Sequence, residues 1–145
     1  MFETLDLPQL VTVLYALLDP GKGTAEVISA GHLPPSVIRV DGSLERFVVP
    51  SSPPLGAGEH PREPVVVTLA ASDTLLKYTD GLVERRGEDL DTGLDRLMHA
   101  AGCLHGQVSD QQLRLLADEL RQTGHDDVTL LAIRSLTDSS RSQAR

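Results

Sequence analysis

The hydrophobic pattern of this chain changes its period once, and that change restricts the possible folds more than any other feature. Up to residue 79 the apolar residues form short runs, which are separated by turn signals such as residues 19–23 and 41–42. Short apolar runs bounded by Gly, Pro and Asp are typical of strands. After Glu84 the apolar residues recur at helical spacing, and a final β-type run fills residues 128–133. The sequence therefore predicts an α+β fold, with antiparallel β-sheets flanked by helices.

The expected strands span residues 10–18, 24–30, 36–40, 44–49, 65–69, 74–79 and 128–133. The first of them is nearly all apolar, which predicts a strand covered on both faces. One helix is expected from about Leu90, with Asp91 or Thr92 as its cap, and a second follows the capping-box pattern that begins at Ser109. The proline-rich segment 50–64 fits neither pattern, and a loop of this length inside a compact domain is usually functional or mobile.

The acidic composition narrows the classes of partner. The 145 residues include 21 acidic and 13 basic side chains, which give a formal net charge of −8. Such a surface argues against a nucleic-acid partner and against docking on a membrane of anionic lipid. No run approaches the ~20 apolar residues of a membrane span, and the single cysteine, Cys103, excludes an internal disulfide. The length of the chain favours a single domain. Since the first residues are acidic where a signal peptide would be basic, we expect that domain to lie in the cytoplasm.

Carboxylates occur at the ends of two expected strands. Asp80 follows the strand at 74–79, and Asp126 and Asp127 precede the strand at 128–133. If these strands are antiparallel neighbours, the end of one lies beside the start of the other, and Asp80 and Asp126 share one rim of the sheet. Two carboxylates that lie close together repel unless a proton or a cation separates them, and a divalent metal ion is the natural occupant. The alternative is a plain strand-to-helix turn in which Asp80 caps the segment that follows.

Four short motifs occur in order along the chain. They are Ser-Ala-Gly-His-Leu-Pro-Pro at 29–35, Pro-Leu-Gly at 54–56, Tyr-Thr-Asp-Gly-Leu-Val-Glu at 78–84 and Asp-Asp-Val-Thr-Leu-Leu at 126–131. From about residue 10 to residue 134 their order and spacing resemble the SpoIIE-like branch of the metal-dependent PPM-type serine/threonine phosphatases. The resemblance implies an incomplete αββα sandwich, in which residues 10–134 form the C-terminal part of a phosphatase domain. Residues 1–9 would then be an N-terminal remnant, and residues 135–145 a flexible tail.

The resemblance also implies a site and a reaction. Asp80 and Asp126 would be ligands of Mn²⁺ or Mg²⁺, with Gly81 and Asp127 adjacent to the metal. In this family two metal ions activate a water molecule, which attacks the phosphorus of phosphoserine or phosphothreonine. No catalytic residue is needed beyond that metal-bound water, which agrees with the absence of a convincing Ser-His-Asp or Cys-His arrangement in the sequence. The implied substrate is a phosphorylated regulatory protein, such as an anti-sigma-factor antagonist.

Two histidines are further candidates, and each has two interpretations. His125 could orient the carboxylate of Asp126, or it could be a solvated residue at a helix end. His32, in its Gly-His-Leu-Pro-Pro loop, could be a polar switch or a contact residue, or it could fix its own turn.

One departure from the family leaves the activity open. Family members carry an upstream Gly-Asp metal motif, and residues 1–9 contain none. The two-metal site is therefore expected to be incomplete. The alternative function is a non-catalytic phosphatase-like interaction module in signalling. An apolar face left without its covering strands would also favour self-association.

Overall fold

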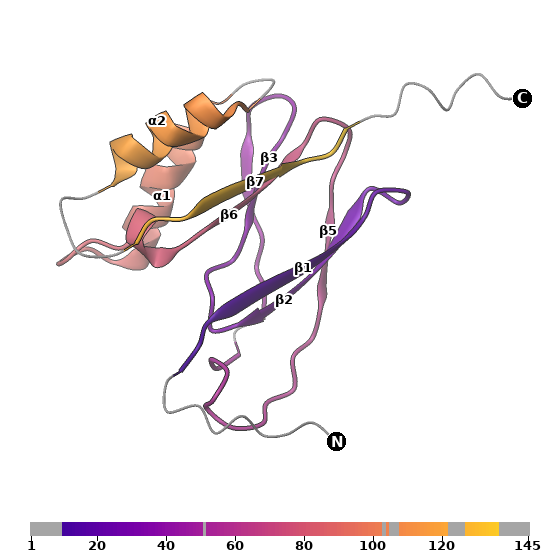
Figure 1. Ribbon diagram of the computed structural model, residues 1–145, viewed down its shortest axis with the longest axis vertical. Coiled ribbons are helices and arrows are strands. Elements are labelled where there is room, and N and C mark those ends of the chain that lie inside the picture. The colour runs from indigo at the N-terminus through magenta and orange to yellow at the C-terminus, as the bar shows by residue number, and fades with distance from the viewer. Residues whose placement is uncertain (1–9, 51, 103, 105–107, 122–126, 137–145) are drawn as a thin grey trace, which may run out of the picture. The chain divides into compact units, whose positions relative to one another are not determined.

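The computed structural model describes residues 10–50, 52–102, 104, 108–121 and 127–136 (Figure 1). These residues form two compact units. Unit 1 comprises the described parts of Met1–Pro34 and Phe47–Thr68, and unit 2 those of Pro35–Arg46 and Leu69–Arg145. The expected remnant at 1–9, Cys103 and most of the expected tail lie outside the described residues. Antiparallel sheets and two longer helices make up the fold, so the predicted α+β class is confirmed.

Unit 1 contains a three-stranded antiparallel sheet in the order β1-β2-β5. Its strands are β1 (Val13–Asp19), β2 (Thr24–Ala30) and β5 (Val65–Thr68). One face of the sheet is buried, and Ala25, Val27 and Val67 there are fully inaccessible. Strand β2 pairs with β5, although the proline-rich segment and two other strands separate them along the chain. The local sequence pattern did not predict this pairing.

The opposite face of this sheet corrects one expectation. Tyr15, Leu17 and Val66 are 56, 55 and 59% exposed, and the register places Tyr15 opposite Ile28 and Leu17 opposite Glu26. The prediction that the first strand is covered on both faces is therefore wrong for the described chain. The apolar run of β1 specified a strand, but β1 lies at the edge of its sheet and exposes alternate side chains.

Unit 2 contains a four-stranded antiparallel sheet in the order β4-β3-β6-β7. Its strands are β3 (Ser36–Ile38), β4 (Leu44–Arg46), β6 (Thr74–Tyr78) and β7 (Leu130–Arg134). Strand β6 lies in the interior of the sheet, and its Leu75 and Leu76 are fully buried. Strand β6 pairs with β3 over Thr74–Leu76 and with β7 along its whole length, so its C-terminal end is held by β7.

The helices of unit 2 follow β6. A short 3-10 helix, η1 (Asp80–Leu82), comes first, and α1 (Leu90–Ala101) and α2 (Asp110–Leu120) follow and contact each other (Figure 1). Helix α2 begins with the predicted capping box. Helix α1 is capped by Asp89, whose side chain accepts a hydrogen bond from the Thr92 N–H, so the expected caps Asp91 and Thr92 are wrong by two or three residues. No helix in the described ranges has the length and apolarity that crossing a membrane requires.

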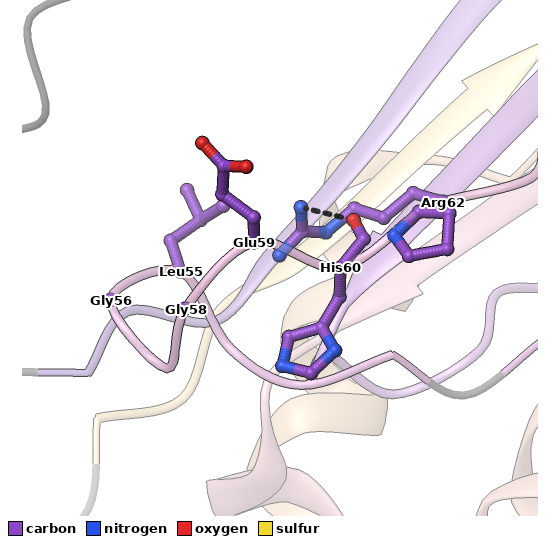
Figure 2. Close-up of a pocket in the computed structure, with 7 residues that line it drawn as sticks. Leu55, Gly56, Gly58, Glu59, His60 and Arg62 are labelled. Atoms are coloured by element: carbon purple, nitrogen blue, oxygen red, sulfur yellow. Dashed lines mark hydrogen bonds between the residues drawn. The ribbon is translucent and has the colours of Figure 1, made fainter.

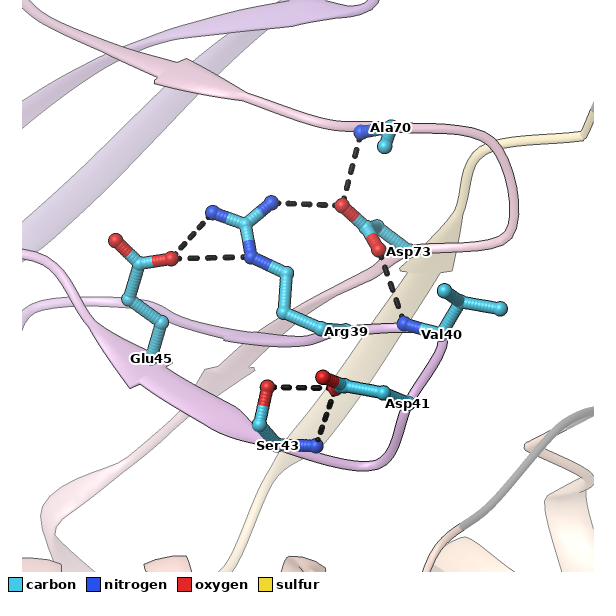
Figure 3. A network of polar contacts seen from close by, with 7 residues as sticks. All are labelled: Arg39, Val40, Asp41, Ser43, Glu45, Ala70 and Asp73. Atoms are coloured by element: carbon cyan, nitrogen blue, oxygen red, sulfur yellow. Dashed lines mark hydrogen bonds and ion pairs between the residues drawn. The ribbon is translucent and has the colours of Figure 1, made fainter.

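A buried carboxylate fixes the turn that enters β6 (Figure 3). The Asp73 side chain is 1% exposed. Its Oδ2 accepts hydrogen bonds from Arg39 Nη1 at 2.6 Å and from the Ala70 N–H at 2.8 Å, and its Oδ1 accepts one from the Val40 N–H at 3.1 Å. Arg39 also donates from Nε to Glu45 at 3.0 Å. The bonds from Arg39 and Val40 therefore tie the β3–β4 hairpin to the start of β6, and the bond from Ala70 closes the turn that precedes it.

Candidate functional site

The end of β6 lies beside the start of β7. The ladder between these antiparallel strands pairs Tyr78 with Leu130, and beyond it the Thr79 N–H donates to the Thr129 carbonyl at 3.1 Å. The two acid-bearing segments are therefore antiparallel neighbours, which is the condition under which their acidic ends share one rim. Asp80 and Asp127, each one or two residues past this pair, are brought to the same rim of the sheet.

The hydroxyl of Thr79 joins the two segments directly. Its Oγ1 accepts a hydrogen bond from the Thr129 N–H at 2.9 Å and donates one to the Asp127 carbonyl oxygen at 3.1 Å. One side chain therefore fixes the residue before Asp80 against the backbone of Asp127. Sequence reasoning treated Thr79 only as a strand residue. The sequence signal for this role was the position of Thr79 between a buried strand and an Asp-Gly pair. A hydroxyl there can make hydrogen bonds to the neighbouring strand where the backbone pairing ends.

Asp80 is the first residue of η1, and its backbone closes the turn. The Asp80 carbonyl oxygen accepts hydrogen bonds from the N–H groups of Val83 and Glu84, both at 2.8 Å. The side chain is exposed, and its Oδ1 accepts one bond from the Gly81 N–H at 2.9 Å. The N-cap position belongs to Thr79, so Asp80 does not cap η1 as the alternative interpretation required. The carboxylate keeps most of its capacity to bind a ligand.

The donor set at this rim suits a hard divalent cation. Asp80 and Asp127 are exposed carboxylates, and carboxylate oxygens are the ligands that Mg²⁺ and Mn²⁺ prefer. No cluster of three or more His, Cys, Asp or Glu side chains that could hold a metal occurs in the part of the chain that the structure describes. The predicted ligand Asp126 and its neighbour His125 lie outside that part. The described rim therefore supplies part of the ligand set of a metal site, and a complete site needs further ligands.

His32 lies in unit 1 and is held by its own turn. The His32 N–H donates a hydrogen bond to Ser29 Oγ at 3.2 Å, and the Ser29 hydroxyl donates one to the His32 carbonyl oxygen at 2.9 Å. The ring Nδ1 of His32 lies 3.2 Å from the Leu33 carbonyl oxygen. These local bonds favour the interpretation in which His32 stabilises the loop.

Two of the sequence motifs meet in this part of unit 1. Gly31 has a φ of +67°, and a Cβ there would lie 2.6 Å from Cγ of Pro54. The Gly31 N–H donates to the Ser52 carbonyl at 2.7 Å. Only glycine allows both the left-handed backbone and this close approach. This explains why the first motif has glycine at the position where Pro54 of the second motif lies against it.

The loop after Pro54 forms a shallow open pocket of about 510 Å³ (Figure 2). Arg62 spans it, because its Nη2 donates to the Pro53 carbonyl at 3.2 Å and its Nη1 to the His60 carbonyl at 3.3 Å. The guanidinium thus links the backbone at the start of the loop to the backbone near its end. The lining residues are Leu55, Gly56, Gly58, Glu59, His60, Pro61 and Arg62, none of which is a predicted site residue.

Comparison with known protein families decides the classification. The model of the stage II sporulation protein E (SpoIIE) family matches residues 1–136. The chain belongs to the SpoIIE family. The predicted resemblance is therefore confirmed, and the rim formed by Thr79, Asp80 and Asp127 lies within the matched region.

Solved structures of similar fold include bacterial phosphatase domains. The RsbU and RsbW domains of a Mycobacterium tuberculosis protein match with a TM-score of 0.67 and 30% identity over 85% of this chain and 36% of that one. The PP2C phosphatase domain of SpoIIE from Bacillus subtilis, with a fragment of its regulatory domain, matches with a TM-score of 0.71 and 24% identity over 85% and 37%. A manganese-presoaked crystal of the same phosphatase domain gives 0.66 and 24% over 88% and 57%. The chain thus spans between about a third and three fifths of these structures.

Proposed function

We propose that this chain takes part in the metal-dependent hydrolysis of phosphoserine or phosphothreonine on a regulatory protein. In this proposal residues 10–134 are the later part of a PPM-type phosphatase domain. The observation that carries the proposal is the bridge from Thr79 to Asp127, which holds Asp80 and Asp127 at one rim. Membership of the SpoIIE family supports the reaction class.

Each residue of the rim has a role in the proposal. Asp80 and Asp126 hold Mn²⁺ or Mg²⁺ through their carboxylates, and Gly81 and Asp127 flank them. When bound, such a cation supplies Lewis acidity to the phosphoryl group and lowers the pKa of water. The chain itself orients the carboxylates: the Gly81 N–H restrains the Asp80 side chain, and Thr79 fixes the spacing of the two segments. The RsbU and RsbW domains named in a similar structure support a partner from sigma-factor signalling, such as an anti-sigma-factor antagonist.

The test is release of phosphate from a phosphoserine peptide with and without Mn²⁺. We expect release that depends on Mn²⁺ and that Asp80→Asn lowers by about a hundredfold or more. Asp118→Asn is the matched control, because Asp118 is an exposed carboxylate on α2. Release that is unchanged in Asp80→Asn would contradict the metal assignment.

A second candidate function is a non-catalytic interaction module. The exposed apolar face of β1-β2-β5, with Tyr15, Leu17 and Val66, favours it, because apolar patches of this kind mark contact surfaces. In this alternative the face binds a second copy of the chain. Sedimentation over a range of concentrations should then show association that Leu17→Asn weakens. A monomer at every concentration, together with Mn²⁺-dependent phosphate release, would favour the enzyme.

A further inference from the structure

Helix α1 contains a glycine at its fourth residue, Gly93, where most residues would form a better helix. Gly93 is buried, and its N–H completes the first turn by donating to the Asp89 carbonyl at 3.4 Å. A Cβ at this position would overlap the Val83 carbonyl oxygen and lie 2.8 Å from the Val83 carbonyl carbon. A backbone carbonyl cannot move aside as a flexible side chain can. The helix therefore needs glycine here because another part of the backbone occupies the space of a side chain.

The peptide that occupies this space is the one that closes the Asp80 turn. Val83 is fully buried, and its N–H donates to the Asp80 carbonyl at 2.8 Å. The next N–H, that of Glu84, donates to the same oxygen. Leu82 in the turn and Leu94 and Leu97 in the helix are 1–3% exposed, so the turn and this face of the helix are both closed to solvent. A displacement of α1 away from Val83 must therefore disturb the bonds that hold Asp80.

We propose that Gly93 is a positioning residue for Asp80. By lacking a side chain, it lets α1 rest on the Val83 peptide and fixes η1, so that the Asp80 carboxylate stands at a constant place on the rim. The link from Asp80 to a metal ion rests on the proposed function, whereas the coupling between Gly93 and the Asp80 turn does not. Carboxylate ligands need this support, because a site that is held loosely binds its ion weakly.

The experiment compares Gly93→Ala with Gly102→Ala. Gly102 ends the same helix, and a Cβ there would meet only Met98 and His99 carbonyl oxygens at 3.3 and 3.4 Å. Amide hydrogen exchange reports the bonds of Val83 and Glu84 to Asp80, and electron paramagnetic resonance of free Mn²⁺ reports binding of the ion. In Gly93→Ala we expect exchange at both amides to accelerate about tenfold or more and the dissociation constant for Mn²⁺ to rise about tenfold. Gly102→Ala should keep the wild-type values of both.

Two results in Gly93→Ala would overturn the proposal. Wild-type protection at Val83 and Glu84 in Gly93→Ala would show that the turn does not depend on the close approach. Lost protection with unchanged Mn²⁺ affinity would show that the turn does not position the ligand. If the wild-type chain binds no Mn²⁺, the proposed function fails, and the exchange rates alone decide whether Gly93 holds the turn.

A measurement on the wild-type chain covers the case in which Gly93→Ala does not fold. The amides of Val83 and Glu84 should open together with those of α1 and therefore show the same protection as the helix. Exchange at these two amides that is about tenfold faster than in α1 would contradict the coupling.

Discussion

Asp73 and Asp80 lie at the two ends of strand β6 and use their carboxylates in opposite ways. Asp73 is almost completely buried, and it accepts hydrogen bonds from Arg39, Ala70 and Val40 (Figure 3). Asp80 is exposed and accepts one bond, from the N–H of its own neighbour Gly81. A buried carboxylate must satisfy its oxygens within the fold, whereas an exposed one at a fixed position remains available to a ligand. The contrast separates a structural aspartate from a candidate functional one within a single strand.

The largest effect on stability is expected at the buried end. In Asp73→Asn an amide group replaces one oxygen that now accepts from Arg39 and Ala70, so donors face donors. Although Arg39 keeps its ion pair with Glu45, buried N–H donors lose their acceptor, so we expect a loss of about 3 kcal/mol in the free energy of unfolding. Urea denaturation followed by circular dichroism measures it. If the loss is as small as that of Asp118→Asn, the network is not what anchors the start of β6.

A smaller loss is expected where β6 ends. Thr79→Val keeps the shape of the side chain but removes the hydroxyl that bonds Asp127 and Thr129, which should cost about 1–2 kcal/mol. Thr79→Ser restores both bonds and should recover most of the stability. Mn²⁺ affinity should follow the same order, with valine weaker than serine. Equal stabilities for the two variants would show that the hydroxyl bridge has little energetic weight.

Tyr78, next to this bridge, should make the free energy of unfolding depend on pH in the alkaline range. Burial raises the pKa of Tyr78, which is 3% exposed. Its contribution to stability is fully present below the pKa of an unfolded tyrosine, about 10, and is lost as the pH rises through the higher folded-state pKa. The unfolding free energy should therefore fall by at most about 1.4 kcal/mol per pH unit in that window. Tyr78→Phe should remove this slope, and a slope that persists in the variant would assign it to another group.

The smallest effect on stability is expected at Asp80, the residue with the largest expected effect on metal binding. Because the side chain is exposed and, among the described residues, bonds only Gly81, Asp80→Asn should change the free energy of unfolding by less than about 0.5 kcal/mol. A loss close to that of Asp73→Asn would mean that both ends of β6 are structural, and the contrast between them would disappear.

The sequence patterns identified the elements because their signals are local. The capping box at Ser109 uses side chains three residues apart, and it forms as expected. The apolar runs at 74–79 and 128–133 predicted the two strands, whereas their pairing was only a condition, which the structure meets. The place of Asp80 at the end of its strand could therefore be predicted, but which strand lies beside that end could not.

The contacts that support the rim could not be predicted, because they join distant segments. Arg39 and Asp73 are 34 residues apart, and neither occurs in a pattern that demands the other. Thr79 and Asp127 are 48 residues apart. Gly93 looked like an ordinary helical position, since the carbonyl that excludes a side chain there comes from a turn outside the helix. Such residues become visible only when packing is known.

The distribution of aromatic residues gives this chain a practical property. It has no tryptophan and only two tyrosines, of which Tyr15 belongs to unit 1 and Tyr78 to unit 2. Tyr15 is half in solvent, and Tyr78 is enclosed one residue from the hydroxyl bridge. Each unit thus contains one intrinsic fluorophore in a different environment. Replacing either tyrosine by phenylalanine would leave emission from one unit alone, so the melting of the two units could be followed separately without any attached dye.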